Sequence, residues 1–273
     1  MGLSTLAGRP QGFFSPYRYA ADVTPPAGYP ALERIFAKAF AAPPSGAMFA
    51  PADVIAAIKL AAPVFATFDG PPPKPRWDQS WYPRLDGAAA YAVLRSAPPA
   101  RVIEVGSGHS TRFLGRAAAD AGADTRITCI DPMPRAAVEG LAIDWQRRLL
   151  SPGDLPMFDA LEAGDVAFFD SSHLLWPGSD VDLILNRILP ALRPGVLIHL
   201  HDIFLPDPYP GSWKWRGYTE QLGLSGWLAG GGADILWSSR YALTRMGADR
   251  WPAIAPLPLP DGALESALWL IRR

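Results

Sequence analysis

The sequence predicts an α/β protein with a Rossmann-like, doubly wound sheet, and three observations support this prediction. Short apolar runs alternate with amphipathic helical patterns from residue 101 onward. A glycine-rich turn, with Gly106 and Gly108, follows the first apolar run and precedes a helical pattern. Polar residues follow each of the later runs. Together these features are typical of a parallel sheet that binds a ligand beyond the carboxyl ends of its strands.

Charge and composition exclude several classes of partner. The 273 residues carry 25 basic and 26 acidic side chains, a balance that predicts no nucleic-acid partner. No apolar run approaches the roughly 20 residues of a membrane helix, and we see no signal peptide. The single cysteine, Cys129, suits a reducing compartment. We therefore expect a cytoplasmic protein that binds neither nucleic acid nor membranes, and the sequence leaves a homo-oligomer open.

The chain divides, on these patterns, into an N-terminal helical cap or lid over residues 1–84 and a sheet domain over residues 85–273. Aromatic residues near the N-terminus are expected to pack on another part of the protein. Asp86 is expected to be the N-cap of the first helix of the sheet domain. The expected helices cover residues 32–40, 51–62 (stopping before Pro63), 86–94, 113–121, 181–192 and 219–229, and the expected strands cover residues 102–105, 126–130, 166–169, 196–200, 235–238 and 267–271.

Residues able to carry chemistry follow the predicted strands at their carboxyl ends. In open parallel sheets these ends lie along one edge, so we expect the residues that follow them to form a single site. The acid after the second strand stands about where a doubly wound fold binds ribose hydroxyls. The residues concerned are Asp131, Asp170, His173, His201 and Asp202.

Several of these features also have a purely structural interpretation. A glycine-rich turn often marks only a tight strand–helix connection, and Asp131 could simply cap its own turn. A pyrophosphate site is disfavoured, because the third glycine of the dinucleotide motif would fall at Thr111. Glu104 would repel phosphate but attract a sulfonium or ammonium ligand. His199 lies inside a predicted strand, where we expect a buried, hydrogen-bonded histidine.

The segment from Glu104 to Ser110, together with Asp131 and Asp170, resembles the class I S-adenosylmethionine-dependent methyltransferases over roughly residues 76–273. Residues 168–173 and 194–204 are similar to the small-molecule branch of these methyltransferases, methyltransferase family 24. The resemblance implies strand order 3-2-1-4-5-7-6 with an antiparallel last strand, and S-adenosylmethionine as cofactor. The cofactor-binding residues that it implies are Glu104, Gly106, Ser107, Gly108, Ser110, Asp131 and Asp170, with Ser151–Asp154 bordering the adenine.

The resemblance also implies a reaction on a small-molecule acceptor. His173 would act as general base and Asp170 would orient it, which favours O-methylation. A similar layout in metal-dependent sugar O-methyltransferases implies a divalent metal on Asp170, His201 and Asp202. His201 stands where those enzymes have glutamate, and this disfavours magnesium. The residues expected to contact the acceptor are Trp81, Tyr82, His201, Tyr209 and Trp213.

Three alternatives stay open at this point. The same fold could methylate nitrogen in a small molecule or a peptide. A nicotinamide-dependent oxidoreductase would use a similar sheet, although the missing third glycine argues against it. A non-catalytic binding module could keep the fold as a scaffold, although the acidic residues at the strand ends argue against that.

Overall fold

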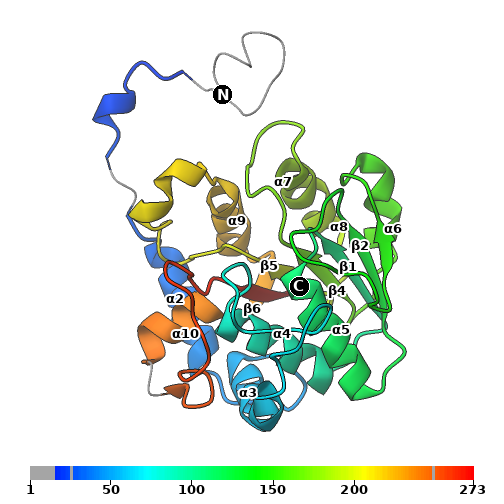
Figure 1. Ribbon diagram of the computed structural model, residues 1–273. Coiled ribbons are helices and arrows are strands. Elements are labelled where there is room, and N and C mark those ends of the chain that lie inside the picture. Colours follow the sequence, from blue (N-terminus) through cyan, green and yellow to red (C-terminus); the bar gives the residue numbers. More distant parts are fainter. Residues whose placement is uncertain (1–15, 25–26, 248–249) are drawn as a thin grey trace.

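A computed structural model describes residues 16–24, 27–247 and 250–273 (Figure 1). Its strands are β1 (Arg101–Val105), β2 (Arg126–Ile130), β3 (Asp144–Gln146), β4 (Val166–Phe169), β5 (Leu197–Leu200), β6 (Ala233–Ser238) and β7 (Leu268–Arg272). They form one seven-stranded sheet of order β3-β2-β1-β4-β5-β7-β6. β7 runs antiparallel to both β5 and β6, whereas the pairs from β3 to β5 are parallel. The predicted fold class and strand order are confirmed.

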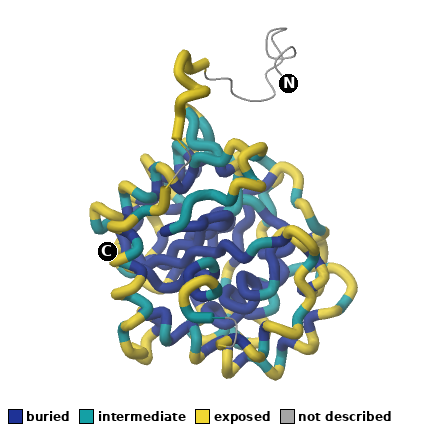
Figure 2. Tube along the Cα trace, turned by 90° about the vertical axis from the view of Figure 1, so that its left-hand side faces the viewer, coloured by how far each residue is buried: buried dark blue, intermediate teal, exposed yellow. Residues whose placement is uncertain are grey.

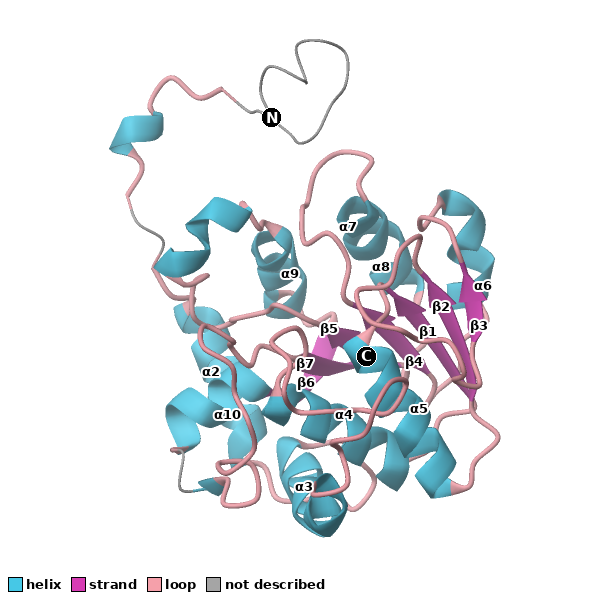
Figure 3. Cartoon of the chain, in the orientation of Figure 1, coloured by secondary structure: helices cyan, strands magenta, loops and turns pink. Residues whose placement is uncertain are grey.

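Helices cover both faces of this sheet (Figure 3). One face packs against α3 (Pro51–Phe65), α4 (Arg84–Ser96) and α5 (His109–Ala121). The other packs against α2 (Pro30–Ala41), α6 (Leu155–Asp159), α9 (Glu220–Ala229) and the continuous helix formed by α7 (Asp180–Leu183), η3 (Ile184–Ile188, a π-helical stretch) and α8 (Leu189–Ala191). The remaining elements are the short turns η1 (Ala20–Asp22), η2 (Pro152–Asp154) and η4 (Gly211–Arg216), and α10 (Ser239–Met246) after β6.

Side chains alternate between the two faces along each strand, which decides the direction of each polar residue. Val102 and Phe168 belong to the core on the α4–α5 face, whereas Ile103 and Phe169 belong to the opposite core. Buried residues fill the centre of the molecule in Figure 2. By this alternation Glu104 of β1 points toward α5 and not toward α9.

The prediction that the second helix stops before Pro63 is wrong, because α3 continues to Phe65. Pro63 lacks the N–H that would bond to the carbonyl of Lys59, but it lies in the last turn, so few helical bonds depend on it. Phe65 is only 1% exposed and packs in the core, which stabilises the extra turn.

Asp86 is not the N-cap of α4, contrary to the prediction. The helix begins two residues earlier, at Arg84, and Pro83 occupies the N-cap position. The fully buried Asp86 carboxylate instead accepts hydrogen bonds from the backbone amides of Ser266 and Ala267, both at 3.0 Å. The Asp86 carboxylate thus binds a segment 180 residues further along the chain and does not cap its own helix.

The expected packing of the N-terminal aromatic residues is wrong for Tyr17 and Tyr19, which are 61% and 53% exposed. Their rings contact each other, with centroids 5.8 Å apart, and η1 stands clear of the body of the protein (Figures 1 and 2). Phe13 and Phe14 lie outside the described residues. Further along, Phe36 of α2 and Val54 of α3 are buried in the two cores, so these helices pack directly on the sheet domain.

The sequence analysis does not predict β3, α6 or α10. β3 has three residues, none of them buried, and it forms the sheet edge beside β2, so neither length nor apolar alternation marks it. None of the helices within residues 16–24, 27–247 and 250–273 combines the length and apolar character that crossing a membrane requires.

Candidate active site

A cavity of about 530 Å³ opens at the carboxyl ends of β1, β2, β4 and β5. Each of these strands contributes a residue to its lining, namely Gly106, Asp131, Asp170 and His201 in that order. The predicted meeting of the four strand ends is therefore observed. Of the other predicted cofactor residues, Ser107 and Ser110 also line this cavity, whereas Glu104 and Gly108 lie behind its wall.

The turn after β1 needs glycine at position 106. Gly106 has φ +81°, and a Cβ built on it would lie 1.8 Å from the carbonyl oxygen of Asp170. No side chain fits at that distance. The close approach of the two backbones holds the β1 turn, where the cofactor is expected, directly against the acid at the end of β4.

Glu104 is fully buried beneath this turn. Its carboxylate accepts hydrogen bonds from Ser110 Oγ at 2.6 Å, Thr111 Oγ1 at 2.7 Å and Cys129 Sγ at 3.2 Å. Burial raises the pKa of Glu104 to about 7, although the hydrogen bonds from Ser110 and Thr111 oppose the shift. Glu104 therefore stabilises the start of α5. The Ser110 hydroxyl, which was expected to contact the cofactor, donates its hydrogen bond to Glu104.

Asp131 holds the turn that follows β2 and also faces the cavity. Its carboxylate accepts hydrogen bonds from the backbone amides of Ser107 at 2.6 Å and Met133 at 2.7 Å, and so ties the β1 turn to the β2 turn. It also lines the cavity. A carboxylate offers about four acceptor positions, so Asp131 can bind a ligand hydroxyl while holding both amides. The Ser151–Asp154 segment is less central, because Leu149 and Leu150 line the cavity in its place.

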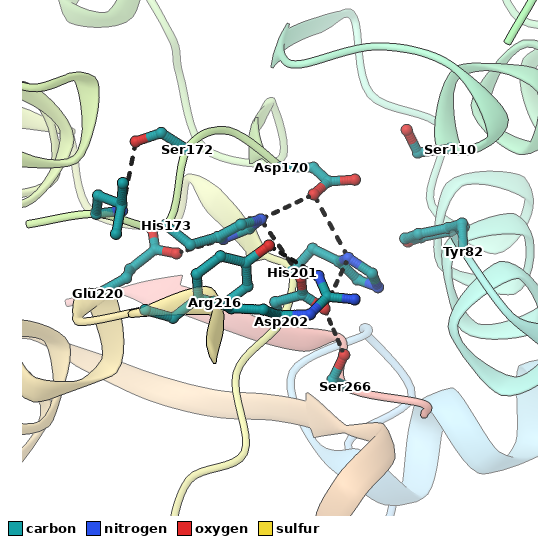
Figure 4. A network of polar contacts seen from close by, with 12 residues as sticks. Tyr82, Ser110, Asp170, Ser172, His173, His201, Asp202, Arg216, Glu220 and Ser266 are labelled. Carbon is teal, nitrogen blue, oxygen red and sulfur yellow. Dashed lines mark hydrogen bonds and ion pairs between the residues drawn. The ribbon is translucent and has the colours of Figure 1, made fainter. Parts of the chain in front are cut away.

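His173 is held between carboxylates on both of its ring nitrogens (Figure 4). Nδ1 lies 2.9 Å from Glu220 Oε2, whereas Nε2 lies 3.3 Å from Asp170 Oδ1 and 3.5 Å from Asp202 Oδ2. His173 and Asp202 both have positive φ, +59° and +55°. A non-glycine residue in this region carries backbone strain, which is concentrated at functional sites.

His201 forms a second dyad that faces the same two acids. Its Nε2 lies 3.2 Å from Asp86 Oδ2, and its Nδ1 lies 3.5 Å from Asp170 Oδ1 and 3.5 Å from Asp202 Oδ1. The sheet register produces this arrangement, because Phe168 of β4 pairs with His199 of β5, which sets Asp170 beside His201 two residues further on.

The acids decide the charge of both histidines. Burial alone would lower the pKa of His173, but hydrogen bonds to Asp170 and Glu220 and the nearby charge of Asp202 raise it well above its usual value. The pKa of His201 is likewise raised by Asp170 and Asp202 against the effect of burial. Burial opposes ionisation of Asp170, yet the two histidines hold its pKa below the usual range.

The predicted metal ligands Asp170, His201 and Asp202 lie together but do not fit a metal. Across the part of the chain that the structure describes, no group of three or more His, Cys, Asp or Glu side chains is arranged to hold a metal ion. His201 Nε2 faces Asp86 at 3.2 Å, and His201 Nδ1 lies 3.5 Å from both Asp170 and Asp202, so both ring nitrogens already have carboxylate partners. These three residues form a hydrogen-bonded charge network.

A second cavity of about 220 Å³ adjoins the first, and the predicted acceptor residues Trp81, His201 and Trp213 line it. Tyr82 is 1% exposed at the wall of the first cavity, and its hydroxyl lies 3.2 Å from His199 Nε2. The expectation of a buried, hydrogen-bonded His199 is confirmed. Tyr209 lies outside both linings, and its hydroxyl accepts a hydrogen bond from the Gln221 amide at 3.3 Å.

The sequence analysis misses four residues of this site. Glu220 contacts His173 from 47 residues away, and Asp86 contacts His201 from 115 residues away. No local sequence pattern reveals contacts at such spacings. Arg216 lines both cavities. His109 starts α5 at the wall of the first cavity, where its buried Nδ1 has no hydrogen-bond partner among the described residues. Its place directly after Gly108 is the one signal that the sequence offers.

Comparison with known proteins identifies the central part of the chain. Residues 103–203 match the family model described as a methyltransferase domain. This range spans β1 to β5 and contains every strand end of the first cavity, so the predicted resemblance to methyltransferase family 24 is confirmed there. No curated protein matches the chain in sequence.

Several solved structures are similar to the chain. A methyltransferase of Podospora anserina, solved with S-adenosylhomocysteine bound, shares 16% identity at TM-score 0.42 and covers 96% of this chain and 99% of its own. An O-methyltransferase of Bacillus cereus, in complex with the same ligand, shares 12% identity at TM-score 0.43 over 80% and 91% of the two chains. A branched-chain polyamine synthase of Thermus thermophilus shares 18% identity at TM-score 0.42 over 78% and 63%. Likeness at this level does not assign a substrate or a residue role.

Proposed function

We propose that the protein transfers a methyl group from S-adenosylmethionine to an oxygen atom of a small molecule, on the premise that residues 103–203 match the family model of a methyltransferase domain. One observation carries the proposal. The first cavity is lined on one side by the glycine turn and Asp131, and on the other by Asp170 and His173. A donor bound on the first side would face an acid–base group on the second.

The donor side of the cavity follows from the β1 and β2 turns. Asp131 would accept the ribose hydroxyls, and the backbone at Gly106 and Ser107 would lie against the methionine part. Glu104 would act from behind the wall, because its hydrogen bonds to Ser110 and Thr111 fix the start of α5. When bound, the cofactor supplies a methyl group that is already activated by a positively charged sulfur.

The chain itself must then align an acceptor oxygen and remove its proton. His173 Nε2 is directed to the space between Asp170 and Asp202, and Glu220 fixes the ring from its other nitrogen. His173 would take the proton from the acceptor hydroxyl. Asp170, whose side chain is 27% exposed, would hold the resulting imidazolium at the cavity wall.

The charge of His173 gives this mechanism a defined pH dependence. Hydrogen bonds to Asp170 and Glu220 raise its pKa, so the resting imidazole carries a proton at neutral pH. It can serve as a base only after that proton is lost. The active fraction therefore grows with pH, and turnover is expected to rise from pH 7 toward alkaline pH.

Calorimetric titration with S-adenosylmethionine and S-adenosylhomocysteine tests the cofactor. The wild-type protein is expected to bind both, and Asp131→Ala to lose at least about 1.4 kcal/mol of binding free energy, or tenfold in affinity. Asp124→Ala removes an exposed acid that precedes β2, at the opposite end of that strand, and should bind as the wild type does. Absence of binding by the wild-type protein would reject the proposed function.

Substitution of His173 tests the base. His173→Gln is expected to lower kcat by about 10² or more while leaving cofactor affinity within about twofold. The rise of turnover with pH should also disappear, which a merely structural role would not cause. A variant that keeps the wild-type pH profile would show that another group takes the proton.

A further inference from the structure

We infer that the second cavity binds the methyl acceptor and that it selects a flat acceptor carrying a carboxylate, which Arg216 holds. This inference rests on the proposed function for the reaction, and it adds the chemical class of the acceptor.

The two cavities share part of their walls, at residues close to the expected chemistry. Trp81, His201, Asp202 and Arg216 line both of them. A molecule in the second cavity therefore places one end at the acids that face His173. Its volume of about 220 Å³ lies below the roughly 300–1,000 Å³ of sites for drug-sized ligands, so the acceptor is small.

Arg216 is a guanidinium whose hydrogen-bonding capacity is largely unused. Nη1 donates to the Tyr218 hydroxyl at 2.9 Å and lies 3.9 Å from Asp202 Oδ2, which exceeds hydrogen-bond distance. Nε is buried and has no hydrogen-bond partner within the described residues, so a ligand cannot reach it. The side chain is nevertheless 24% exposed, and Nη2 forms no hydrogen bond with a described residue. A carboxylate can bind the edge formed by Nη1 and Nη2 through two parallel N–H bonds.

The plane of this guanidinium is already fixed. Its Cζ lies 4.1 Å from the Trp213 ring centroid and 5.4 Å from that of Tyr218. Stacking on two rings limits rotation, so little order would be lost when an anion binds. Arg216 is therefore prepared for a ligand that approaches edge-on to the guanidinium.

The walls of the second cavity favour a flat ligand. Trp81 and Trp213 line it from two segments that are far apart in the chain. Trp81 is 47% exposed, and the Arg135 guanidinium lies 4.3 Å from its ring centroid, which restrains the indole. Indole surfaces held in this way contact aromatic rings well.

Two acids that line the second cavity, Asp202 and Asp261, would attract an amine. Asp202 lies 3.5 Å from His173, 3.5 Å from His201 and 3.9 Å from Arg216, so neighbouring cationic groups compensate its charge. Asp261 is exposed, so water screens its charge. The balance favours an anion.

Three probes that differ in one group test the inference. Protein saturated with S-adenosylhomocysteine is titrated calorimetrically with 4-hydroxybenzoate, 4-hydroxybenzyl alcohol and 4-hydroxybenzylamine. We expect the acid to bind about tenfold more tightly than the alcohol, the usual gain from a charge-assisted pair. Arg216→Gln should abolish that difference, and Arg216→Lys should restore only part of it. Arg193→Gln, at a position 58% exposed, is the control for loss of one charge.

The remaining outcomes overturn the inference. Equal affinity for acid and alcohol, tighter binding of the amine, or no binding of any probe would each refute it, as would an acid preference that survives Arg216→Gln. Thermal unfolding of each variant shows whether it is folded. If S-adenosylhomocysteine itself fails to bind, the proposed function falls, and the same three titrations on the protein alone still decide the inference.

Discussion

Ionisation of the buried Glu104 should make the stability of this protein fall between pH 5 and pH 8. The perturbation that exposes the effect is Glu104→Gln, which keeps the shape of the side chain and removes its charge. Among the described residues, Glu104 forms no ion pair, and Ser110, Thr111 and Cys129 are the side chains that donate to its carboxylate. These hydrogen bonds offset the effect of burial only in part, and the charged form is disfavoured in the folded state.

The size of the stability change follows from the pKa shift of Glu104. Folding moves the pKa of Glu104 from 4.5 to about 7, so the folded state binds a proton that the unfolded state has lost. The stabilisation from this proton is present below the unfolded pKa and is lost as pH rises through the folded pKa. Relative to Glu104→Gln, the wild-type protein should lose about 2 to 3 kcal/mol of unfolding free energy between pH 5 and pH 8.

Urea unfolding of both proteins at pH 5, 6, 7 and 8 measures this difference. Glu162→Gln, which removes a side chain that is 68% exposed, is the matched control and should follow the wild-type profile. A constant offset between wild type and Glu104→Gln at all four pH values would refute the reasoning. It would mean that the Ser110 and Thr111 hydroxyls keep the carboxylate charged despite its burial.

The remaining predictions concern the backbone, the second histidine and the metal. Gly106→Ala should lower the free energy of unfolding by more than about 3 kcal/mol, because the new Cβ would meet the Asp170 carbonyl. The control Gly164→Ala, at a similar φ but with open space around it, should lower it by about 1 kcal/mol. Equal losses in urea unfolding would show that φ alone matters. Asp86→Asn should cost about 3 kcal/mol, since it removes the charge opposite His201, and a thermal unfolding shift of under a degree would contradict this. Methyl transfer should survive exhaustive chelation, because the described acids and histidines do not form a metal site; loss of activity that added metal restores would prove otherwise.

Local patterns in the sequence predicted the fold well, because most of its determinants are local. The apolar runs at β1, β2, β4 and β5 are buried on both faces, and their composition alone marks them as central parallel strands. The glycine turn and the acids after each strand also lie where the predicted topology places them. β3 was not predicted, because an edge strand of three residues has no apolar pattern that would mark it.

The charge network could not be predicted in the same way. Asp170, His173, His201 and Asp202 are adjacent to strand ends and were identified as candidates. Their partners depend on tertiary packing. Asp86 looked like a helix cap because acids favour that position, but its carboxylate is satisfied by backbone amides before β7. Glu104 was placed at the cofactor by resemblance, whereas strand alternation turns it into the core behind the cavity.

The position of β7 between β5 and β6 has a consequence for how this protein is made. β6 and β5 do not pair with each other, so the sheet stays open on that side until the later strand inserts. The same insertion delivers the amides that hydrogen-bond to Asp86, which in turn holds His201. The acceptor half of the cavity therefore depends on a segment that is translated long after the donor half. Contacts this distant in the chain form slowly, so the acceptor half is expected to be completed last.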